Sequence, residues 1–306
     1  MAPQIRVRPA AVAGLFYPGD PVALRSTVES LLAARPRRAA GASAGSSAAE
    51  PPAAPASRPP KALIAPHAGY SYSGPIAASA FATLAEGTAG ATGTARTAGA
   101  VGTAGATAAA EVRRVVLLGP SHQVPLRGLG LPGVERFSTP LGEVSLDLEA
   151  AAAVGRLPQV AVRPDAHEAE HSLEVELPFL QVVLGSFELL PLVVGQAGGE
   201  EVAEVLELVW GGDDTVLVIS SDLSHYLPAE AAERMDRETA AQILALAGPL
   251  TSRQACGAVP INGLLAAARR QGLVPRQLDL RHSGDTSGDR SRVVGYGAWA
   301  FDAHAA

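Results

Sequence analysis

An apolar run that passes into a polar, histidine-bearing turn decides the fold: Val216-Leu217-Val218-Ile219-Ser220-Ser221-Asp222-Leu223-Ser224-His225. The same pattern occurs twice earlier, where Leu63-Ile64-Ala65 precedes His67 and Val115-Val116-Leu117-Leu118 precedes His122. Short apolar runs bounded by polar turns indicate strands. In an open α/β sheet the ligand crevice lies outside the carboxyl ends of the strands. The three histidines are therefore predicted to converge at one edge of a sheet.

Strand-like and helix-like segments alternate along the chain. The expected strands are 62–65, 114–118, 189–194, 216–220 and 292–300, and the expected helices are 21–34, 75–84, 172–184, 200–209, 229–247 and 260–271. This alternation predicts an α/β fold with a mixed, mostly parallel sheet that helices cover on both faces.

The composition excludes several classes of protein. The chain has 306 residues, of which 47% are apolar, and a net charge of −6 from 24 basic and 30 acidic residues. It is too apolar to be wholly disordered, and its acidic balance argues against a nucleic-acid binder. One cysteine, Cys256, rules out an intramolecular disulfide framework.

The whole chain, 1–306, is predicted to form one domain that carries two low-complexity insertions, at 35–60 and 86–110. These two segments are rich in Ala, Gly, Pro, Ser and Thr and lack periodic large apolar residues, so we expect flexible loops. Neither a signal peptide nor an apolar stretch of membrane-spanning length is evident, which predicts no membrane association and a cytoplasmic location.

Cys256 stands just before a predicted helix that has Pro260 in its first turn. The partial positive charge of a helix N-terminus favours the thiolate, which is the metal-binding form of cysteine. An inert, buried cysteine is the alternative. Combined with His67 and His122, however, Cys256 makes a plausible metal site.

A second histidine motif, His167-Glu168-Ala169-Glu170-His171, matches the zinc-peptidase pattern H-E-x-x-H. That pattern requires a helix so that both histidines share a face. Here Pro164 precedes the motif and Ser172 is a good helix N-cap, so the motif is expected in a loop, with His167 at the surface. A zinc peptidase using His167, Glu168 and His171 is therefore a remote alternative. His282 is also expected to be solvated.

Taken in order, several motifs give the chain a resemblance to the Memo family. The resemblance is carried by Arg8-Pro9-Ala10-Ala11-Val12-Ala13-Gly14-Leu15-Phe16-Tyr17-Pro18, Pro66-His67-Ala68-Gly69-Tyr70, Gly119-Pro120-Ser121-His122, Thr139-Pro140-Leu141-Gly142, Glu170-His171-Ser172-Leu173-Glu174, Ser221-Asp222-Leu223-Ser224-His225, Cys256-Gly257 and Pro260-Ile261.

This resemblance implies a fold similar to that of class III extradiol dioxygenases. It implies a metal site of His67, His122 and Cys256, with Asp222 and His225 beside it as catalytic residues. It also implies an AMMECR-like protein and a radical-SAM protein as partners, together with an unknown small molecule or peptide.

The leading hypothesis is a redox-active mononuclear metal protein, with oxidoreductase activity as its expected enzymatic role. Its metal is expected to be Fe(II), with Cu or Zn as alternatives, because a thiolate ligand is soft. His225 is expected to act as acid, base or fourth ligand, with Asp222 fixing its tautomer. His171 and Tyr70 are expected to line the pocket. A non-enzymatic module that binds peptide or protein is the second hypothesis.

Overall fold

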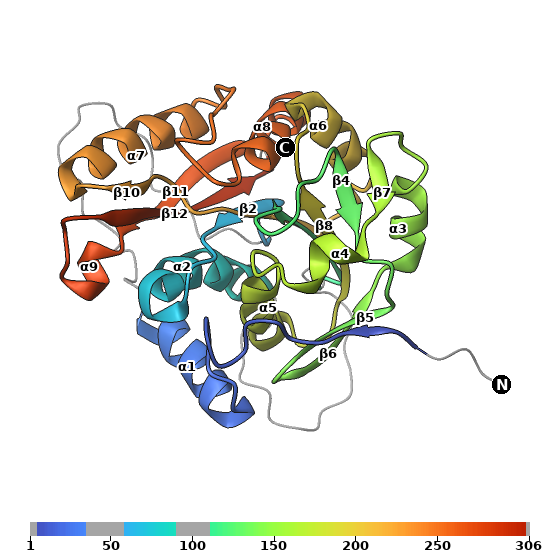
Figure 1. The fold of residues 1–306 in the computed structure, drawn as a ribbon. Helices are drawn as coiled ribbons and strands as arrows, with labels where there is room; N and C mark the ends of the chain where they lie inside the picture. The colour runs from blue at the N-terminus through green and yellow to red at the C-terminus, as the bar shows by residue number, and fades with distance from the viewer. Residues whose placement is uncertain (1–4, 35–57, 90–110, 304–306) are drawn as a thin grey trace, which may run out of the picture.

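The computed structural model describes residues 5–34, 58–89 and 111–303, and four parallel strands form its centre. They are hydrogen-bonded in the order β8 (Glu188–Val194), β3 (Arg114–Pro120), β9 (Thr215–Ser220) and β2 (Ala62–Ala65) (Figure 1). Beside β2 runs the antiparallel β12 (Val293–Asp302), which also pairs with β11 (Val274–His282). The mixed, mostly parallel sheet expected from the sequence is confirmed.

Short strands extend this sheet at its edges. β6 (Gly142–Leu146) pairs with β8 and leads through β5 (Arg136–Thr139) to β1 (Val7–Arg8). β4 (Leu129–Leu131) joins β8 to β7 (Val160–Val162), and β10 (His225–Leu227) pairs with β12. None of these short strands is among those expected from the sequence, because each is too brief to show a clear alternating pattern.

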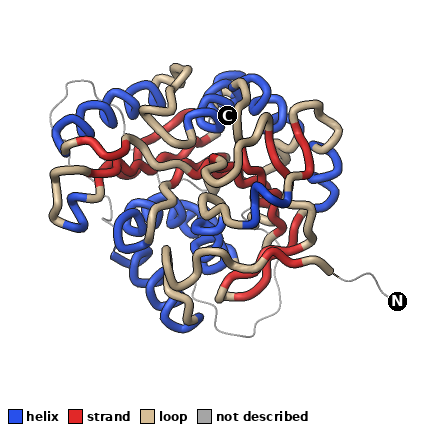
Figure 2. The backbone as a smooth tube through the Cα atoms, viewed as in Figure 1, coloured by secondary structure: helices blue, strands red, loops and turns tan. Residues whose placement is uncertain are grey.

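Helices cover both faces of the sheet (Figures 1 and 2). One face carries α1 (Pro21–Ala34), α2 (Tyr70–Ala89) and α5 (Leu177–Leu184), which contact one another. The other face carries α3 (Leu148–Val154), α6 (Gly199–Leu208), α7 (Ala229–Leu244) and α8 (Ala258–Gln271). Shorter helical segments are α4 (Pro164–Glu168), a 3₁₀ helix (Glu174–Glu176) and α9 (Gly284–Ser287).

The central strands are apolar on both faces because helices bury both. Val115 and Leu117 of β3 pack into the core beneath α2, while Val116 and Leu118 pack into the core beneath α8. Successive side chains of a strand point to opposite faces, so one continuous apolar run serves two cores. All six residues of β9 are buried for the same reason. This burial fixes where the strands end, and hence where the polar turns lie.

Most of the two low-complexity segments, 35–60 and 86–110, lies outside the described residues. The expectation of flexible loops there stays a prediction. Residues 86–89 belong to the end of α2 rather than to a loop. At the other segment, Arg58 lies 3.1 Å from a carboxylate oxygen of Asp213. Within the described ranges, no helix is long and apolar enough to cross a bilayer.

Two expectations about local structure are wrong. The helix predicted from Ser172 is instead a turn, a 3₁₀ helix and then α5, because the Ser172 hydroxyl donates to the Pro120 carbonyl at 2.9 Å rather than capping a helix. His282 is buried, not solvated. It ends β11 between Glu233 and Asp285, whose carboxylate oxygens lie 3.3 and 3.4 Å from its ring nitrogens. Carboxylates on both sides make burial of this polar ring tolerable.

Candidate metal centre

The polar turns after β2, β3 and β9 meet at one edge of the sheet because these strands are parallel neighbours. His67, His122 and Asp222 each stand two residues beyond the end of their strand. His171 reaches the same place from the loop after α4. Segments far apart in the sequence thus deliver imidazoles to one point.

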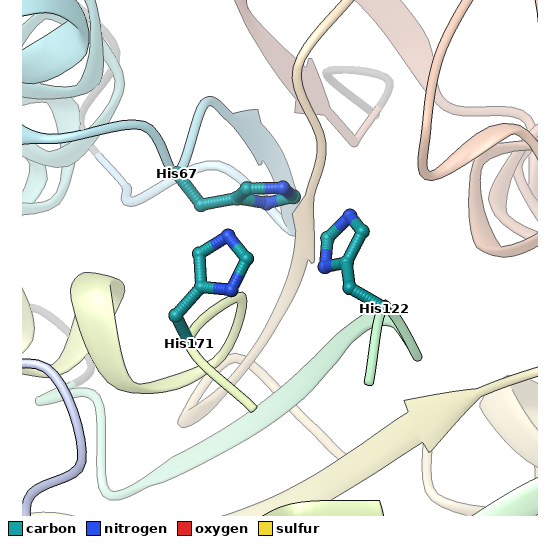
Figure 3. A group of neighbouring side chains, drawn as sticks. All are labelled: His67, His122 and His171. Atoms are coloured by element: carbon teal, nitrogen blue, oxygen red, sulfur yellow. The ribbon is translucent and has the colours of Figure 1, made fainter. Parts of the chain in front are cut away.

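His67, His122 and His171 form one cluster (Figure 3). One ring nitrogen of each lies within 4.8 Å of the others, and the ring centroids are 4.8 to 5.4 Å apart. His67 is buried, His171 is half-buried and His122 is exposed, so the cluster has a closed side and an open side. Three imidazoles with an open side can hold a metal ion and leave room for another ligand.

Glu170 orients two of these rings. Its buried carboxylate lies 2.9 Å from His122 Nδ1 and 3.3 Å from His171 Nδ1, and it accepts the backbone N–H of His122 at 2.5 Å and that of Ser172 at 2.9 Å. Burial alone would raise the pKa of Glu170, but the hydrogen bonds and charge of His122 and the backbone donors outweigh burial and hold it at about 2. An ionised carboxylate on Nδ1 leaves Nε2 of His122 as the nitrogen that can bind a metal.

His67 and His171 are kept neutral. Burial, reinforced by the neighbouring imidazoles, lowers the pKa of His67 well below its usual range, and burial also lowers the pKa of His171. Neutral imidazole is the form that ligates a metal. The Phe16 ring packs at a tilt against His171 with ring centroids 4.7 Å apart, so the N-terminal segment helps to place this ring.

Cys256 lies beside the cluster rather than within it. Its Sγ is 3.4 Å from His67 Nε2 and accepts the backbone N–H of Asp222 at 3.3 Å. The residue does precede α8 as expected, yet burial and then the Asp222 carboxylate raise the pKa of the thiol to about 12. Burial thus opposes the thiolate form that the helix N-terminus was expected to favour. The role of Cys256 as a metal ligand stays a prediction.

The other predicted residues have unexpected partners. His225 is half-buried, and its Nδ1 lies 2.8 Å from the Leu223 carbonyl instead of contacting Asp222. Asp222 accepts the backbone N–H of His67 at 2.9 Å, and burial raises its pKa to about 7. Asp222 therefore supports the His67 turn. The buried Tyr70 donates its hydroxyl to the Val175 carbonyl at 2.8 Å, so that hydroxyl already has a partner.

The H-E-x-x-H motif is divided between two environments. His167 is buried in α4, where its Nε2 lies 2.7 Å from the Gly130 carbonyl, whereas Glu168 is exposed. The expectation that His167 lies in a surface loop is wrong, because its ring is used to tie α4 to β4. Among the described residues, the cluster with metal-ligand spacing contains His171 but neither His167 nor Glu168.

Glu170 and Ser220 are residues of the site that were not predicted from the sequence. Glu170 lies inside a quoted family motif, but only its contacts with two histidines indicate an orienting role. Ser220 ends β9, and its Oγ lies 2.7 Å from His67 Nδ1. The one indication in the sequence for Ser220 was its position directly after the apolar run 216–219.

Comparison with known proteins identifies the family. A family model described as Memo-like protein matches residues 8–300. A MEMO1 family protein of Methanothermobacter thermautotrophicus is 34% identical over 95% of this chain and 98% of its own length. Relatives from Sulfolobus acidocaldarius and Methanopyrus kandleri are 34% and 35% identical, over 95% and 96% of this chain and 97% and 98% of their own lengths.

A solved structure of an uncharacterised Escherichia coli K12 protein overlaps with 63% of this chain and 88% of that one, at 13% identity and a TM-score of 0.40. That overlap is too distant to support an inference. The sequence matches, by contrast, run through every stretch that builds the histidine cluster, and the chain belongs to the Memo family.

Proposed function

We propose that this Memo-family protein binds a single redox-active metal ion through His67, His122 and His171. The observation that carries the proposal is the convergence of three ring nitrogens within 4.8 Å, two of the rings being neutralised by burial. Glu170 supports the same conclusion, because a carboxylate that holds Nδ1 of a metal-binding histidine is the usual arrangement behind such ligands.

Fe(II) is the proposed metal, with Cu or Zn as alternatives. Three imidazoles suit all of these ions and are poor ligands for magnesium or calcium, which prefer oxygen. A redox-active ion would supply one-electron chemistry at the exposed side of the cluster. Cys256, 3.4 Å from His67 Nε2, can join the ligand set on losing its proton, which a bound cation favours.

The residues around the cluster are proposed to orient the rings, admit a substrate and transfer a proton. Glu170 and the Ser220 hydroxyl orient the rings, and exposed His122 marks the side from which a substrate enters. Half-buried His225, whose pKa is lowered by burial, is proposed to take up a proton there as a neutral base. The AMMECR-like and radical-SAM partners remain proposals, tested by whether either protein co-purifies with this chain.

Metal analysis of the anaerobically purified full chain tests the proposal. His67→Ala, His122→Ala and His171→Ala are each expected to lower metal affinity by more than about 100-fold, because each removes a ligand. His225→Ala is expected to retain the metal. Stoichiometric metal in all three cluster variants would refute the proposed centre.

Two further outcomes separate the alternatives. Loss of metal from His167→Ala and His171→Ala but not from His67→Ala would support a zinc peptidase. A metal-loaded protein that takes up oxygen no faster than the same metal free in solution would support a non-enzymatic binding module. Cys256→Ser distinguishes a ligand from a neighbour, since a ligand's loss weakens binding as strongly as a histidine's.

A further inference from the structure

A buried chain of hydrogen bonds begins at His67 Nδ1. The Ser220 hydroxyl oxygen is 2.7 Å from His67 Nδ1, 2.6 Å from the Ser172 carbonyl and 2.8 Å from Glu176 Oε1. Ser172, Ser220 and Glu176 have no exposed surface, and His67 is 2% exposed. Solvent therefore does not compete for these contacts.

The number of available protons decides the direction of each bond. A serine hydroxyl has one proton and two lone pairs, and a backbone carbonyl only accepts. Ser220 must therefore donate to Ser172. Its remaining contacts, with His67 Nδ1 and Glu176 Oε1, are satisfied only if both of those atoms carry a proton. An ionised Glu176 would leave two acceptor oxygens, on Ser172 and Glu176, competing for a single proton.

The surroundings of Glu176 favour the same protonated form. Burial raises the pKa of Glu176 well above its usual range, and the Asp222 carboxylate adds to that rise. No cation is among the groups that shift it, and Oε2 has no hydrogen-bond partner among the described residues. A charged carboxylate in this position would be buried without a counter-ion, which is far more costly than a neutral acid.

We propose that Glu176 is a positioning residue that keeps a proton on Oε1, donates it to Ser220, and through Ser220 holds His67 as the Nδ1–H tautomer with Nε2 free for the metal. The proposal rests on the metal centre proposed above. The two histidines would then have different partners at Nδ1. The Nδ1 of His122 faces the ionised Glu170, whereas the Nδ1 of His67 faces a neutral hydroxyl that is hydrogen-bonded to a neutral acid. His67 is therefore the less basic metal ligand.

Infrared spectroscopy of the full-length chain tests the proton on Glu176 without requiring any metal. At about pH 8.5, Asp222 and Asp236 are mostly ionised, since their pKa values are about 7 and about 6. The wild type is expected to show the carbonyl band of a neutral carboxylic acid, shifted in D₂O and lost in Glu176→Gln. Glu170→Gln is the matched control and keeps this band. A wild type without the band overturns the proposal.

Nitrogen-15 NMR of histidine-labelled protein tests the tautomer. The His67 ring, assigned by its loss in His67→Asn, is expected to carry its proton on Nδ1 in the wild type and in Glu176→Gln, whose amide can donate to Ser220 as the acid does. In Glu176→Leu, which fills the space but donates nothing, a mixture of tautomers is expected. The Nε2–H form in the wild type would overturn the proposal.

Competition between the protein and a chelator for Fe(II), under anaerobic conditions, tests whether the proton on Glu176 affects metal affinity. Glu176→Leu and Ser220→Ala are expected to weaken binding by about 10-fold to 100-fold, and Glu176→Gln to restore it to within about 3-fold of the wild type. Glu176→Gln that behaves like Glu176→Leu contradicts the donor role. If the wild type binds no Fe(II), the metal centre fails, while the infrared and NMR results still decide the state of Glu176.

Discussion

Removing the Glu174 carboxylate is expected to destabilise the fold strongly, because it is the centre of a buried network that fastens the N-terminal segment. Glu174 is completely buried. It accepts hydrogen bonds from Arg8 at 2.6 Å, Tyr17 at 2.5 Å, and the backbone N–H groups of Ala11 and Val12 at 2.7 and 3.0 Å. Glu174→Ala leaves the 5% exposed guanidinium of Arg8 without its counter-ion.

Breaking a buried ion pair by removing one partner costs about 3–5 kcal/mol. Arg8 keeps its bonds to the carbonyls of His167 and Glu170, at 2.7 and 2.6 Å, which limits the loss. We therefore expect Glu174→Ala to lower the free energy of unfolding by about 4 kcal/mol. That is a large fraction of the roughly 5–15 kcal/mol typical of a folded protein. The midpoint of thermal unfolding should fall by about 10 °C.

Urea denaturation of wild type, Glu174→Ala and Glu135→Ala measures this effect. The Glu135 control also pairs with an arginine near the N-terminus, Arg6, at 2.9 Å, but that pair is exposed and should contribute little. The urea slope should be unchanged, which keeps the comparison at constant exposed surface. Equal stability of the two variants would refute the buried-network argument. Because Phe16, in the segment that Glu174 fastens, packs against His171, Glu174→Ala should also weaken metal retention.

Three further predictions concern single positions. Glu170→Gln should lower metal affinity by about 10-fold to 100-fold in a chelator competition, since a neutral amide orients His122 and His171 less firmly; unchanged affinity would contradict the orienting role. Burial lowers the pKa of His167 to about 4, so its neutral form contributes stability above pH 6.5 that is lost as pH falls to about 4. Relative to His167→Gln, the wild type should therefore lose about 3 kcal/mol between pH 7 and pH 4 in urea titrations, and a pH-independent difference would contradict this. Gly257→Ala would place its Cβ 2.6 Å from Ser221 Cβ and 2.9 Å from the Ser220 carbonyl, which should cost about 2 kcal/mol in urea unfolding, whereas Gly212→Ala, with its nearest contact at 3.4 Å, should be almost neutral.

The sequence predicts the central strands and their polar ends because those features are local. The run at 62–65 has the bounds of β2, and the helix at 21–34 has those of α1. Parallel strands place their carboxyl ends together, so the meeting of His67 and His122 follows from the strand pattern alone. The edge strands show no such local pattern, since β11 includes Pro275, Arg276 and Asp279 and becomes a strand by pairing with β12.

The direction of a side chain in a loop is what the sequence leaves open. His171 and His167 are four residues apart, yet one joins the cluster and the other bonds to Gly130. Had a regular helix continued through this stretch, both rings would lie on one face. The break after α4 separates them, and it is held by contacts with residues far away in the sequence, such as Ser172 with Pro120. Long-range contacts therefore decide which histidines meet.

Ionisation is a further property that residue type does not determine. Glu170 and Glu176 are six residues apart and both buried, and an ordinary solution pKa would make both ionised. Glu170 faces the His122 ring and two backbone N–H donors, which stabilise its charge despite burial. Glu176 faces one hydroxyl whose proton the Ser172 carbonyl already takes. Burial raises the pKa of both carboxyls, and only Glu170 has enough donors turned toward it to outweigh burial. Glu170 is therefore an anion that orients rings, whereas Glu176 is an acid that fixes a tautomer.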